Sequence, residues 1–317
     1  MAERWAAVLP ALLREHVEAS LPDWVEPLWF ASKAEALALA PRAQIGWFDM
    51  YDKRDMAQAI AAASGLRWLN SIFAGVDSMP LPLLQQRGVV LTNGAGINAI
   101  TIAEYVLMGM LAMAKGYRQV VRAQDRHEWL KEAPGRLELA GSRALLLGHG
   151  GIGKLVQARL MAFDVEVTVV RRGAEAGGAS LGPDQWRGRL ADFDWIILAV
   201  PSTPETLHML GAAEFAAMKR GAMLVNVARG SVVDQDALVQ ALLAGQLGGA
   251  FLDVTEPEPL PAEHVLWTMD NVHLSMHLSG RSQTRMFERS GQRFLDNLAR
   301  WRAGQPLLHQ VDLALGY

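Results

Sequence analysis

Three residues of this 317-residue chain have side chains that could act together on a small keto acid: Arg229, Glu258 and His277. Histidine suits proton transfer because its ordinary pKa lies near neutrality. A carboxylate beside it stabilises the imidazolium and fixes the tautomer of the ring. Arginine can hold a substrate carboxylate and polarise a carbonyl group. Together with a hydride donor, these groups could reduce a ketone to an alcohol.

Each of the three residues also has a structural interpretation when taken alone. Arg229 could cap a loop, Glu258 could be a solvated turn residue, and His277 could be an ordinary loop histidine. All three, however, follow short buried runs that read as strands. Open parallel sheets bind their ligands beyond the carboxyl ends of the strands, so the shared placement favours a catalytic site.

A glycine-rich loop follows the apolar run at residues 143–147 and precedes a helical pattern. It has the form G-x-G-x-x-G and comprises Gly148, His149, Gly150, Gly151, Ile152 and Gly153. The first glycine permits a tight turn, the second lets a pyrophosphate approach the backbone, and the third lets helix and strand pack closely. An ordinary glycine-rich turn is the alternative, but the strand before and the helix after favour dinucleotide binding. In that setting the backbone of His149 matters more than its side chain.

The next apolar run, residues 165–170, ends in Arg171 and Arg172. An NAD site usually has Asp or Glu at this place, about 20 residues after the glycine loop, to bind the ribose hydroxyls. Guanidinium groups would instead bind the 2′-phosphate of NADP. Two solvated surface arginines are the alternative. We expect NADP to be preferred over NAD.

The elements that must position these residues alternate between strand-like and helical patterns. Such alternation predicts parallel sheets with right-handed crossovers, an α/β fold. The expected strands are residues 44–48, 66–73, 89–92, 143–147, 165–170, 195–200, 223–227, 249–253 and 272–275. The expected helices are residues 152–163, 212–218 and 236–244, with two longer ones near 98–116 and 285–302 that could connect two lobes.

Composition excludes several classes of site. The chain contains no cysteine, which rules out disulfides, zinc–thiolate sites and cysteine nucleophiles, and we expect no metal centre. A net charge of −3 gives no indication of nucleic-acid or membrane-surface binding. The longest apolar run, residues 97–114, contains Asn98, Thr101 and Glu104 and reads as a buried helix. The N-terminus lacks a signal-peptide pattern, so we expect a cytoplasmic protein.

From about residue 72 to about residue 280 the sequence resembles the D-isomer-specific 2-hydroxyacid dehydrogenases. The matching motifs occur in order along the chain. They are Ala74-Gly75-Val76-Asp77, Thr92-Asn93, Ala103-Glu104, the glycine loop, Val200-Pro201, Thr203-Pro204-Glu205-Thr206, the run 215–227, Ala228-Arg229-Gly230, Leu252-Asp253-Val254, Glu258-Pro259-Leu260-Pro261 and His277.

The resemblance implies a role for each matching residue. Arg229 would bind the carboxylate and carbonyl of the substrate, His277 would be the acid/base, and Glu258 its partner. The substrate carboxylate would also meet the backbone amides of Ala74, Gly75 and Val76. The cofactor would contact the glycine loop, Arg171, Arg172, Val200, Pro201, Thr206, Asp253 and His277, with Val227, Ala228, Arg229 and Gly280 near the nicotinamide.

The same resemblance implies two Rossmann-like lobes with doubly wound parallel sheets. A substrate lobe, residues 1–97 and 285–317, would contain the inserted cofactor lobe, residues 98–284, with the active site between them. Family members usually form dimers through the cofactor lobe, so we expect a homodimer. The expected activity transfers a hydride between NADP(H) and a small 2-keto or 2-hydroxy acid such as glyoxylate or hydroxypyruvate.

Some features leave alternatives open. Family members usually have proline before the catalytic histidine, whereas Met276 stands here and would loosen the loop. The first 70 residues or so match poorly. A non-enzymatic dinucleotide sensor on the same fold would keep these residues, and formate oxidation is disfavoured because such members have glutamine in place of Glu258. The aromatic residues Trp47, Phe48, Phe73 and Trp129 could shape a substrate pocket or belong to the core.

Overall fold

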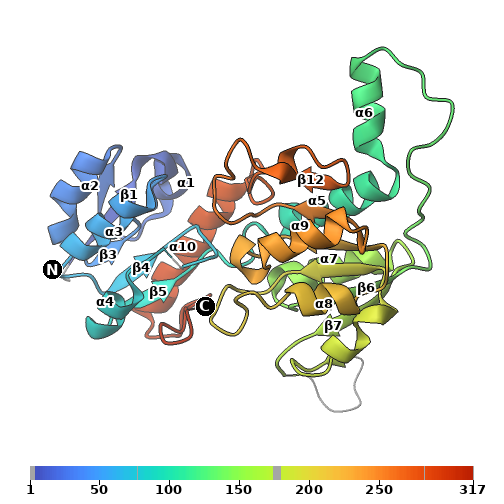
Figure 1. Ribbon diagram of the computed structural model, residues 1–317. Helices are drawn as coiled ribbons and strands as arrows, with labels where there is room; N and C mark the ends of the chain where they lie inside the picture. Colours follow the sequence, from blue (N-terminus) through green and yellow to red (C-terminus); the bar gives the residue numbers. More distant parts are fainter. Residues whose placement is uncertain (1–3, 77, 174–179, 282, 317) are drawn as a thin grey trace. The chain divides into compact units, whose positions relative to one another are not determined.

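The computed structural model describes residues 4–76, 78–173, 180–281 and 283–316. Asp77, one residue of the Ala74-Gly75-Val76-Asp77 motif, lies outside the described residues. The chain forms two compact units. We call Met1–Asn98 with Gln283–Tyr317 the outer unit, and Ala99–Ser282 the inserted unit. Each contains an all-parallel sheet with helices, which confirms the predicted α/β class (Figure 1).

The sheet of the outer unit has five strands in the order β2-β1-β3-β4-β5. The strands are β1 (Trp5–Pro10), β2 (Val25–Phe30), β3 (Ile45–Gly46), β4 (Trp68–Asn70) and β5 (Val90–Thr92). The sequence patterns located β3, β4 and β5 but missed β1 and β2. In β2 the apolar pattern is interrupted by Pro27, which cannot donate to a ladder and is tolerated because β2 is an edge strand.

Helices surround this sheet: α1 (Arg14–Val17), α2 (Lys33–Leu39), α3 (Lys53–Ala62), α4 (Leu81–Gln86) and α10 (Met286–Arg302). The long helix α10 packs its apolar face on the sheet, with Phe294 5.1 Å from Trp68 and 5.2 Å from Trp47 between ring centroids. Trp47 and Phe48 are therefore core residues, each 1% exposed. Phe73, in contrast, is 38% exposed.

The sheet of the inserted unit has seven strands in the order β12-β11-β10-β9-β6-β7-β8. The first group is β6 (Arg143–Leu147), β7 (Glu166–Val170) and β8 (Ser180–Leu181). The chain then returns to the other side of β6 with β9 (Trp195–Leu198), β10 (Ala222–Asn226), β11 (Leu247–Leu252) and β12 (Val272–Leu274). The direction of winding therefore reverses between β6 and β9, the position where doubly wound sheets bind ligands.

Helices α5 (Ala99–Ala114), α7 (Gly151–Met161), α8 (Ala212–Ala217) and α9 (Gln235–Leu243) accompany this sheet. Helix α5 approaches β11 closely, because a Cβ on Gly109 would lie only 2.4 Å from the ring of Phe251. Most of the apolar run 97–114 thus forms a helix, α5, which packs on the sheet as expected.

A short helix, α6 (Tyr117–Asp125), follows α5 after Gly116, whose φ of +60° turns the chain. With the segment after it, α6 projects from the rest of the inserted unit (Figure 1). Trp129 lies on this projecting arm and is 95% exposed. Within the described residues no single helix is long and apolar enough to cross a membrane, and α5 and α6 reach that measure only as a pair bent by 73°.

Candidate active site

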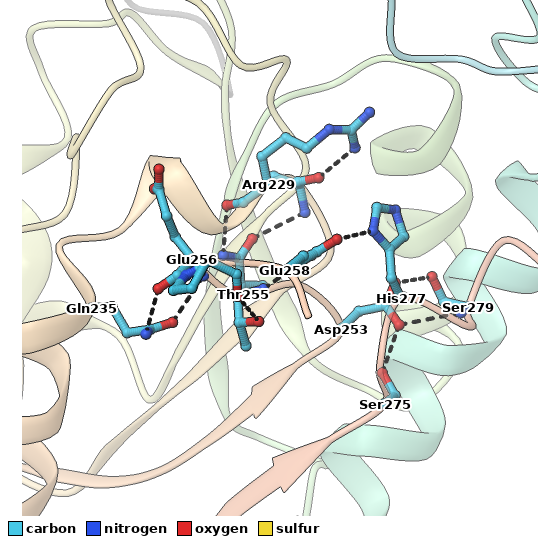
Figure 2. A network of polar contacts seen from close by, with 12 residues as sticks. Arg229, Gln235, Asp253, Thr255, Glu256, Glu258, Ser275, His277 and Ser279 are labelled. Carbon is cyan, nitrogen blue, oxygen red and sulfur yellow. Dashed lines mark hydrogen bonds and ion pairs between the residues drawn. The ribbon is translucent and has the colours of Figure 1, made fainter. Parts of the chain in front are cut away.

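The ring of His277 and the carboxylate of Glu258 are in direct contact. His277 Nδ1 lies 2.8 Å from Glu258 Oε2, and Glu258 Oε1 accepts a bond of 3.1 Å from the amide of Thr255 (Figure 2). An ionised carboxylate has only acceptors, so Nδ1 must carry the proton of this bond. The other ring nitrogen, Nε2, is then the atom that can exchange a proton with a substrate.

The environment of Glu258 keeps this carboxylate ionised. Partial burial raises its pKa, but the hydrogen bond and charge of His277, the Thr255 amide and the charge of Arg229 together outweigh burial. The net effect is a pKa below the ordinary value of glutamate. Glu258 is therefore a charged acceptor for His277 throughout the neutral range.

His277 lies in a tight turn directly after β12. The amide of Leu278 donates to the carbonyl of Ser275 over 3.0 Å, and the two central residues, Met276 and His277, have φ values of +53° and +56°. Residues with side chains rarely adopt this left-handed conformation. Proline, with φ locked near −65°, could not occupy the position of Met276 here. Met276, which stands in place of the usual proline, thus lies in a hydrogen-bonded turn, and the loop is not loosened as the sequence suggested.

Asp253, the first residue after β11, fixes this turn from both ends. Its carbonyl accepts the amide of His277 over 2.6 Å, and its carboxylate accepts the hydroxyl of Ser275 over 2.7 Å. The amide of Ser279 donates to the same carboxylate over 3.2 Å, and the Ser279 hydroxyl also donates to it. Asp253 is 3% exposed. It therefore positions the main chain that carries His277, while contact with a cofactor stays a prediction.

Arg229 follows β10 on the neighbouring loop. The side chain of Asn226 accepts from the amide of Ala228 over 3.0 Å and donates to the carbonyl of Arg229 over 2.9 Å. The next residue, Gly230, packs so closely that a Cβ would lie 2.1 Å from the carbonyl of Thr255. The loops after β10 and β11 are thus in contact, which brings Arg229, Glu258 and His277 into one region (Figure 2).

The guanidinium of Arg229 is partly exposed, and its Nη1 donates to the carbonyl of Ala228 over 2.8 Å. Its charge contributes to the lowered pKa of Glu258. A partly exposed guanidinium beside a histidine–carboxylate pair can bind an anionic substrate and orient it toward the imidazole.

The glycine loop connects β6 to α7 with the geometry that its spacing predicts. Gly148 has φ +101°, and a Cβ there would lie 2.4 Å from the carbonyl of Ala199. At Gly153 a Cβ would lie 2.2 Å from the carbonyl of Gly148, whereas at Gly150 it would meet open space. Gly148 and Gly153 therefore allow close packing, and Gly150 leaves room for a phosphate group at the start of α7.

Residues 107–279, more than half of the chain, match the model of the family described as D-isomer specific 2-hydroxyacid dehydrogenase, NAD binding domain. The chain belongs to this family. It is a member of the NAD(P)-dependent D-2-hydroxyacid dehydrogenase family of enzymes, and the predicted resemblance, enzyme class and two-sheet fold are confirmed.

Relatives support the same assignment. D-3-phosphoglycerate dehydrogenase of Archaeoglobus fulgidus is 32% identical over 262 residues, which cover 81% of this chain and 49% of that protein, so this chain spans about half its length. A family member from Aeromonas salmonicida subsp. salmonicida has a crystal structure with 29% identity and a TM-score of 0.85, covering 98% of this chain and 100% of that one. The NADPH-dependent glyoxylate/hydroxypyruvate reductase of Sinorhizobium meliloti, solved with NADP and malonate, has 25% identity and a TM-score of 0.79 over 99% of this chain and 98% of that one.

The remaining predicted cofactor residues of this dehydrogenase lie on loops of the inserted unit. Arg171 and Arg172 follow β7 and are exposed, and Arg171 Nε donates to the hydroxyl of Ser180 over 3.2 Å. The Thr206 hydroxyl donates to the carbonyl of Pro201 over 2.7 Å, which ties together the loop after β9. His149 Nε2 lies 2.7 Å from Gln157 Oε1, so its ring is engaged by α7. The other predicted contacts are Val200, Ile152 and Gly280, each partly buried, and Val227 and Ala228, both buried.

The predicted substrate loop belongs to the outer unit of the dehydrogenase. Ala74 is exposed, Gly75 is partly buried and Val76 is buried. The side-chain amide of Asn93 donates to the carbonyl of Ala74 over 2.7 Å. The loop therefore has a defined conformation within its own unit.

Sequence reasoning missed several residues that hold the site together. Gln235 binds the main chain of Glu256 through two bonds, donating to its carbonyl over 2.7 Å and accepting from its amide over 3.0 Å. This fixes the loop that carries Glu258. The positioning roles of Asn226, Ser275 and Ser279 were missed as well. Asn226 lies in a matching motif, but no motif assigns a role to any of these side chains, and only their proximity in the fold reveals their function.

Proposed function

We propose that this dehydrogenase reduces a small 2-keto acid, such as glyoxylate or hydroxypyruvate, with NADPH as the preferred cofactor. The observation that carries the proposal is the 2.8 Å contact between His277 and Glu258, with Arg229 on the adjoining loop. The similar structure of the glyoxylate/hydroxypyruvate reductase from Sinorhizobium meliloti supports this substrate class.

In the proposed mechanism, Arg229 binds the substrate carboxylate and polarises its carbonyl group. Backbone amides of Ala74, Gly75 and Val76 bind the same carboxylate. The nicotinamide supplies a hydride to the carbonyl carbon when NADPH is bound. His277 donates its Nε2 proton to the carbonyl oxygen, while Glu258 holds the Nδ1 proton and stabilises the ring in its charged form. Oxidation of the 2-hydroxy acid uses the same groups in reverse.

Turnover tests this function directly. Wild-type protein should oxidise NADPH in the presence of glyoxylate or hydroxypyruvate, followed at the absorbance of the reduced nicotinamide. A panel of 2-keto acids with larger side chains would identify the preferred substrate. Binding of NADPH without turnover of any 2-keto acid would contradict the proposal and favour a dinucleotide-sensing protein.

The cofactor preference rests on Arg171, the residue after β7. Arginine has no acceptor for the ribose hydroxyls of NAD, but it can donate charge-assisted bonds to the 2′-phosphate of NADP. Such bonds contribute roughly 1.5–3 kcal/mol each, less when exposed to solvent. We expect kcat/KM to be at least about tenfold higher with NADPH than with NADH, since 1.4 kcal/mol corresponds to a factor of ten.

Two variants test the cofactor assignment. Arg171→Asp should invert the preference, because it repels the phosphate and accepts bonds from the hydroxyls. Arg171→Ala should lose most of the preference, whereas Arg189→Ala should retain it, because Arg189 is a partly exposed arginine of the inserted unit that pairs with Asp192 at 3.0 Å. An unchanged NADPH/NADH ratio in Arg171→Ala would show that Arg171 only faces solvent.

A homodimer is the proposed assembly, through the projecting arm that we define as residues 117–137. Large apolar side chains on this arm are exposed: Tyr117, Val120, Val121, Trp129, Leu130 and Leu137. A second copy of the chain would cover them.

Sedimentation tests this assembly. The wild type should give twice the monomer mass, and Trp129→Glu should shift the measured mass toward that of the monomer. A wild-type monomer would overturn the proposal.

A further inference from the structure

The outer unit contains a carboxylate that accepts three hydrogen bonds from its surroundings. Asp49 lies three residues past the end of β3. Its Oδ2 accepts from the indole Nε1 of Trp47 over 2.6 Å and from the amide of Ile72 over 2.5 Å. Its Oδ1 accepts the hydroxyl of Ser71 over 2.7 Å. Two of these donors belong to the segment that follows the neighbouring strand β4.

This segment, residues 71–74, leads directly into the proposed substrate loop. The Ser71 hydroxyl accepts from the amide of Phe73 over 3.1 Å, so the side chain held by Asp49 in turn holds the next residues. Ser71 is 2% exposed and Ile72 is 8% exposed. Asp49 therefore fixes the main chain immediately before Ala74.

Residues after β5 hold the same segment from a second side. The amide of Gly94 donates to the carbonyl of Phe73 over 2.8 Å, and the Asn93 side chain donates to the carbonyl of Ala74 over 2.7 Å. A Cβ at Gly94 would lie 1.8 Å from the carbonyl of Ile72, which shows how closely the two chains approach. Segment 71–74 is thus held between Asp49 and residues 93–94.

The charge of Asp49 does not serve stability at neutral pH. Burial raises its pKa to about 6, although the bonds from Ile72, Ser71 and Trp47 oppose the shift. A carboxyl group whose pKa is higher in the folded than in the unfolded chain favours folding at low pH, and this contribution is lost as the pH rises through about 6. The carboxylate is nevertheless the group that fits here, because it alone accepts from all three donors. Asparagine would turn an N–H₂ group toward one of them.

We propose that Asp49 is a positioning residue for substrate binding, which holds segment 71–74 so that the amides of Ala74, Gly75 and Val76 keep the conformation that binds the substrate carboxylate. This inference rests on the proposed function of that loop. Asp49 acts through Ser71 and Ile72 and is not assigned a contact with the substrate.

The experiment compares Asp49→Asn with Asp52→Asn. Both variants remove one negative charge from the segment between β3 and α3. Asp52 makes a matched control because its carboxylate caps α3 instead, accepting from the amides of Arg54 and Asp55 over 2.7 and 3.3 Å. We expect Asp49→Asn to raise KM for glyoxylate by about tenfold or more while kcat changes by less than about threefold, the signature of lost substrate binding. Asp52→Asn should keep the wild-type KM, and Kd for NADPH should stay unchanged in both.

Hydrogen exchange gives a readout that does not depend on turnover. The amides of residues 72–75 should exchange faster in Asp49→Asn than in the wild type or in Asp52→Asn. Ser71→Ala removes only one of the bonds to Asp49 and should raise KM in the same direction by a smaller factor, which keeps the test decisive if Asp49→Asn does not fold.

The possible failures are distinguishable. A wild-type KM in Asp49→Asn, or in Ser71→Ala if only that variant folds, would overturn the role of Asp49. An equal rise of KM in Asp52→Asn would also overturn it, because the effect would then follow from lost charge or stability. Absence of turnover by the wild type would instead contradict the proposed function and, with it, the substrate role of the loop.

Discussion

Two aspartates, Asp253 and Asp49, occupy similar places in the two sheets. Asp253 follows β11 and accepts the hydroxyl of Ser275, just past the neighbouring strand β12, over 2.7 Å. Asp49 follows β3 and accepts the hydroxyl of Ser71, just past the neighbouring strand β4, also over 2.7 Å. Each also accepts a backbone amide from the same loop. In both units, a carboxylate at the end of one strand thus holds the loop that leaves the next strand.

The two loops differ in what they present. The loop held by Asp253 presents the side chain of His277, whereas the loop held by Asp49 leads to the backbone amides of Ala74 and its neighbours. Backbone conformation also differs: Met276 and His277 have left-handed φ values, and none of the residues 71–76 does. The same local arrangement can therefore support a strained turn with one reactive side chain or a relaxed loop with several main-chain donors.

We expect the largest loss of activity when His277, the side chain presented by the loop that Asp253 holds, is replaced. His277→Gln keeps a polar side chain but cannot transfer a proton, so kcat should fall by about 10²–10⁴-fold. Kd for NADPH and thermal stability should change little. His127→Gln, on an exposed residue of the same unit, is the matched control and should keep the wild-type rate. Near-normal turnover of His277→Gln would remove this residue from the mechanism.

Replacing the supporting aspartate should give a smaller effect of a different kind. Asp253→Asn exchanges one acceptor for a donor, which leaves a buried bond to Ser275 or Ser279 unmade at a cost of about 1–3 kcal/mol. Because this turn aligns His277, we expect kcat to fall by about tenfold with KM for the keto acid within about threefold. Asp49→Asn should instead raise KM for the keto acid and change kcat by less than about threefold. If Asp253→Asn raises KM and leaves kcat unchanged, the two aspartates do not differ in the way proposed.

The sequence predicted much of the inserted unit because its chemistry depends on residue types. Gly148 and Gly153 of the cofactor loop have no room for a side chain, and Arg229, Glu258 and His277 follow short, mainly apolar strands. Prediction could go as far as the strand ends. It could not show that Gly230 brings the loops of Arg229 and Glu258 into contact, since that depends on a 2.1 Å approach to Thr255 in space.

The outer unit was less predictable for two physical reasons. First, strand β2 contains Pro27 and β1 ends at Pro10, so neither has a clean strand pattern. These two segments become strands because they pair with each other in parallel, and a sequence pattern does not show that pairing. Second, the substrate loop acts through backbone amides, which any residue type supplies. Its support, Asp49, meets Ser71 only across 22 positions of sequence. No motif marks such a residue.

The pair of Glu258 and His277 should depend on the charge of Glu258. Glu258→Gln removes the negative charge 2.8 Å from the ring, so the protonated imidazole that donates the proton loses a stabilising neighbour. Reduction of the keto acid should therefore be slower than in the wild type, measured as kcat with saturating cofactor. Glutamine can still orient the ring, so kcat should fall by less than in His277→Gln. An unchanged kcat would count against coupling between the two groups.

The smallest effect concerns the strain in the turn that Asp253 holds. Met276 is exposed and has φ +53°, a conformation that costs residues with a Cβ about 1–2 kcal/mol and that asparagine tolerates best after glycine. Met276→Asn should therefore raise the free energy of unfolding by about 0.5–1 kcal/mol, or Tm by about 1–4 °C. Leu278→Asn is the control, because Leu278 is exposed in the same turn but its φ is not left-handed.

The same two substitutions, combined with Asp253→Asn, test whether strain is the reason that the turn depends on Asp253. If it is, Met276→Asn should also recover part of the kcat lost in Asp253→Asn, whereas Leu278→Asn should recover none. Equal recovery in both, or none in either, would show that the turn keeps its shape without help from the aspartate.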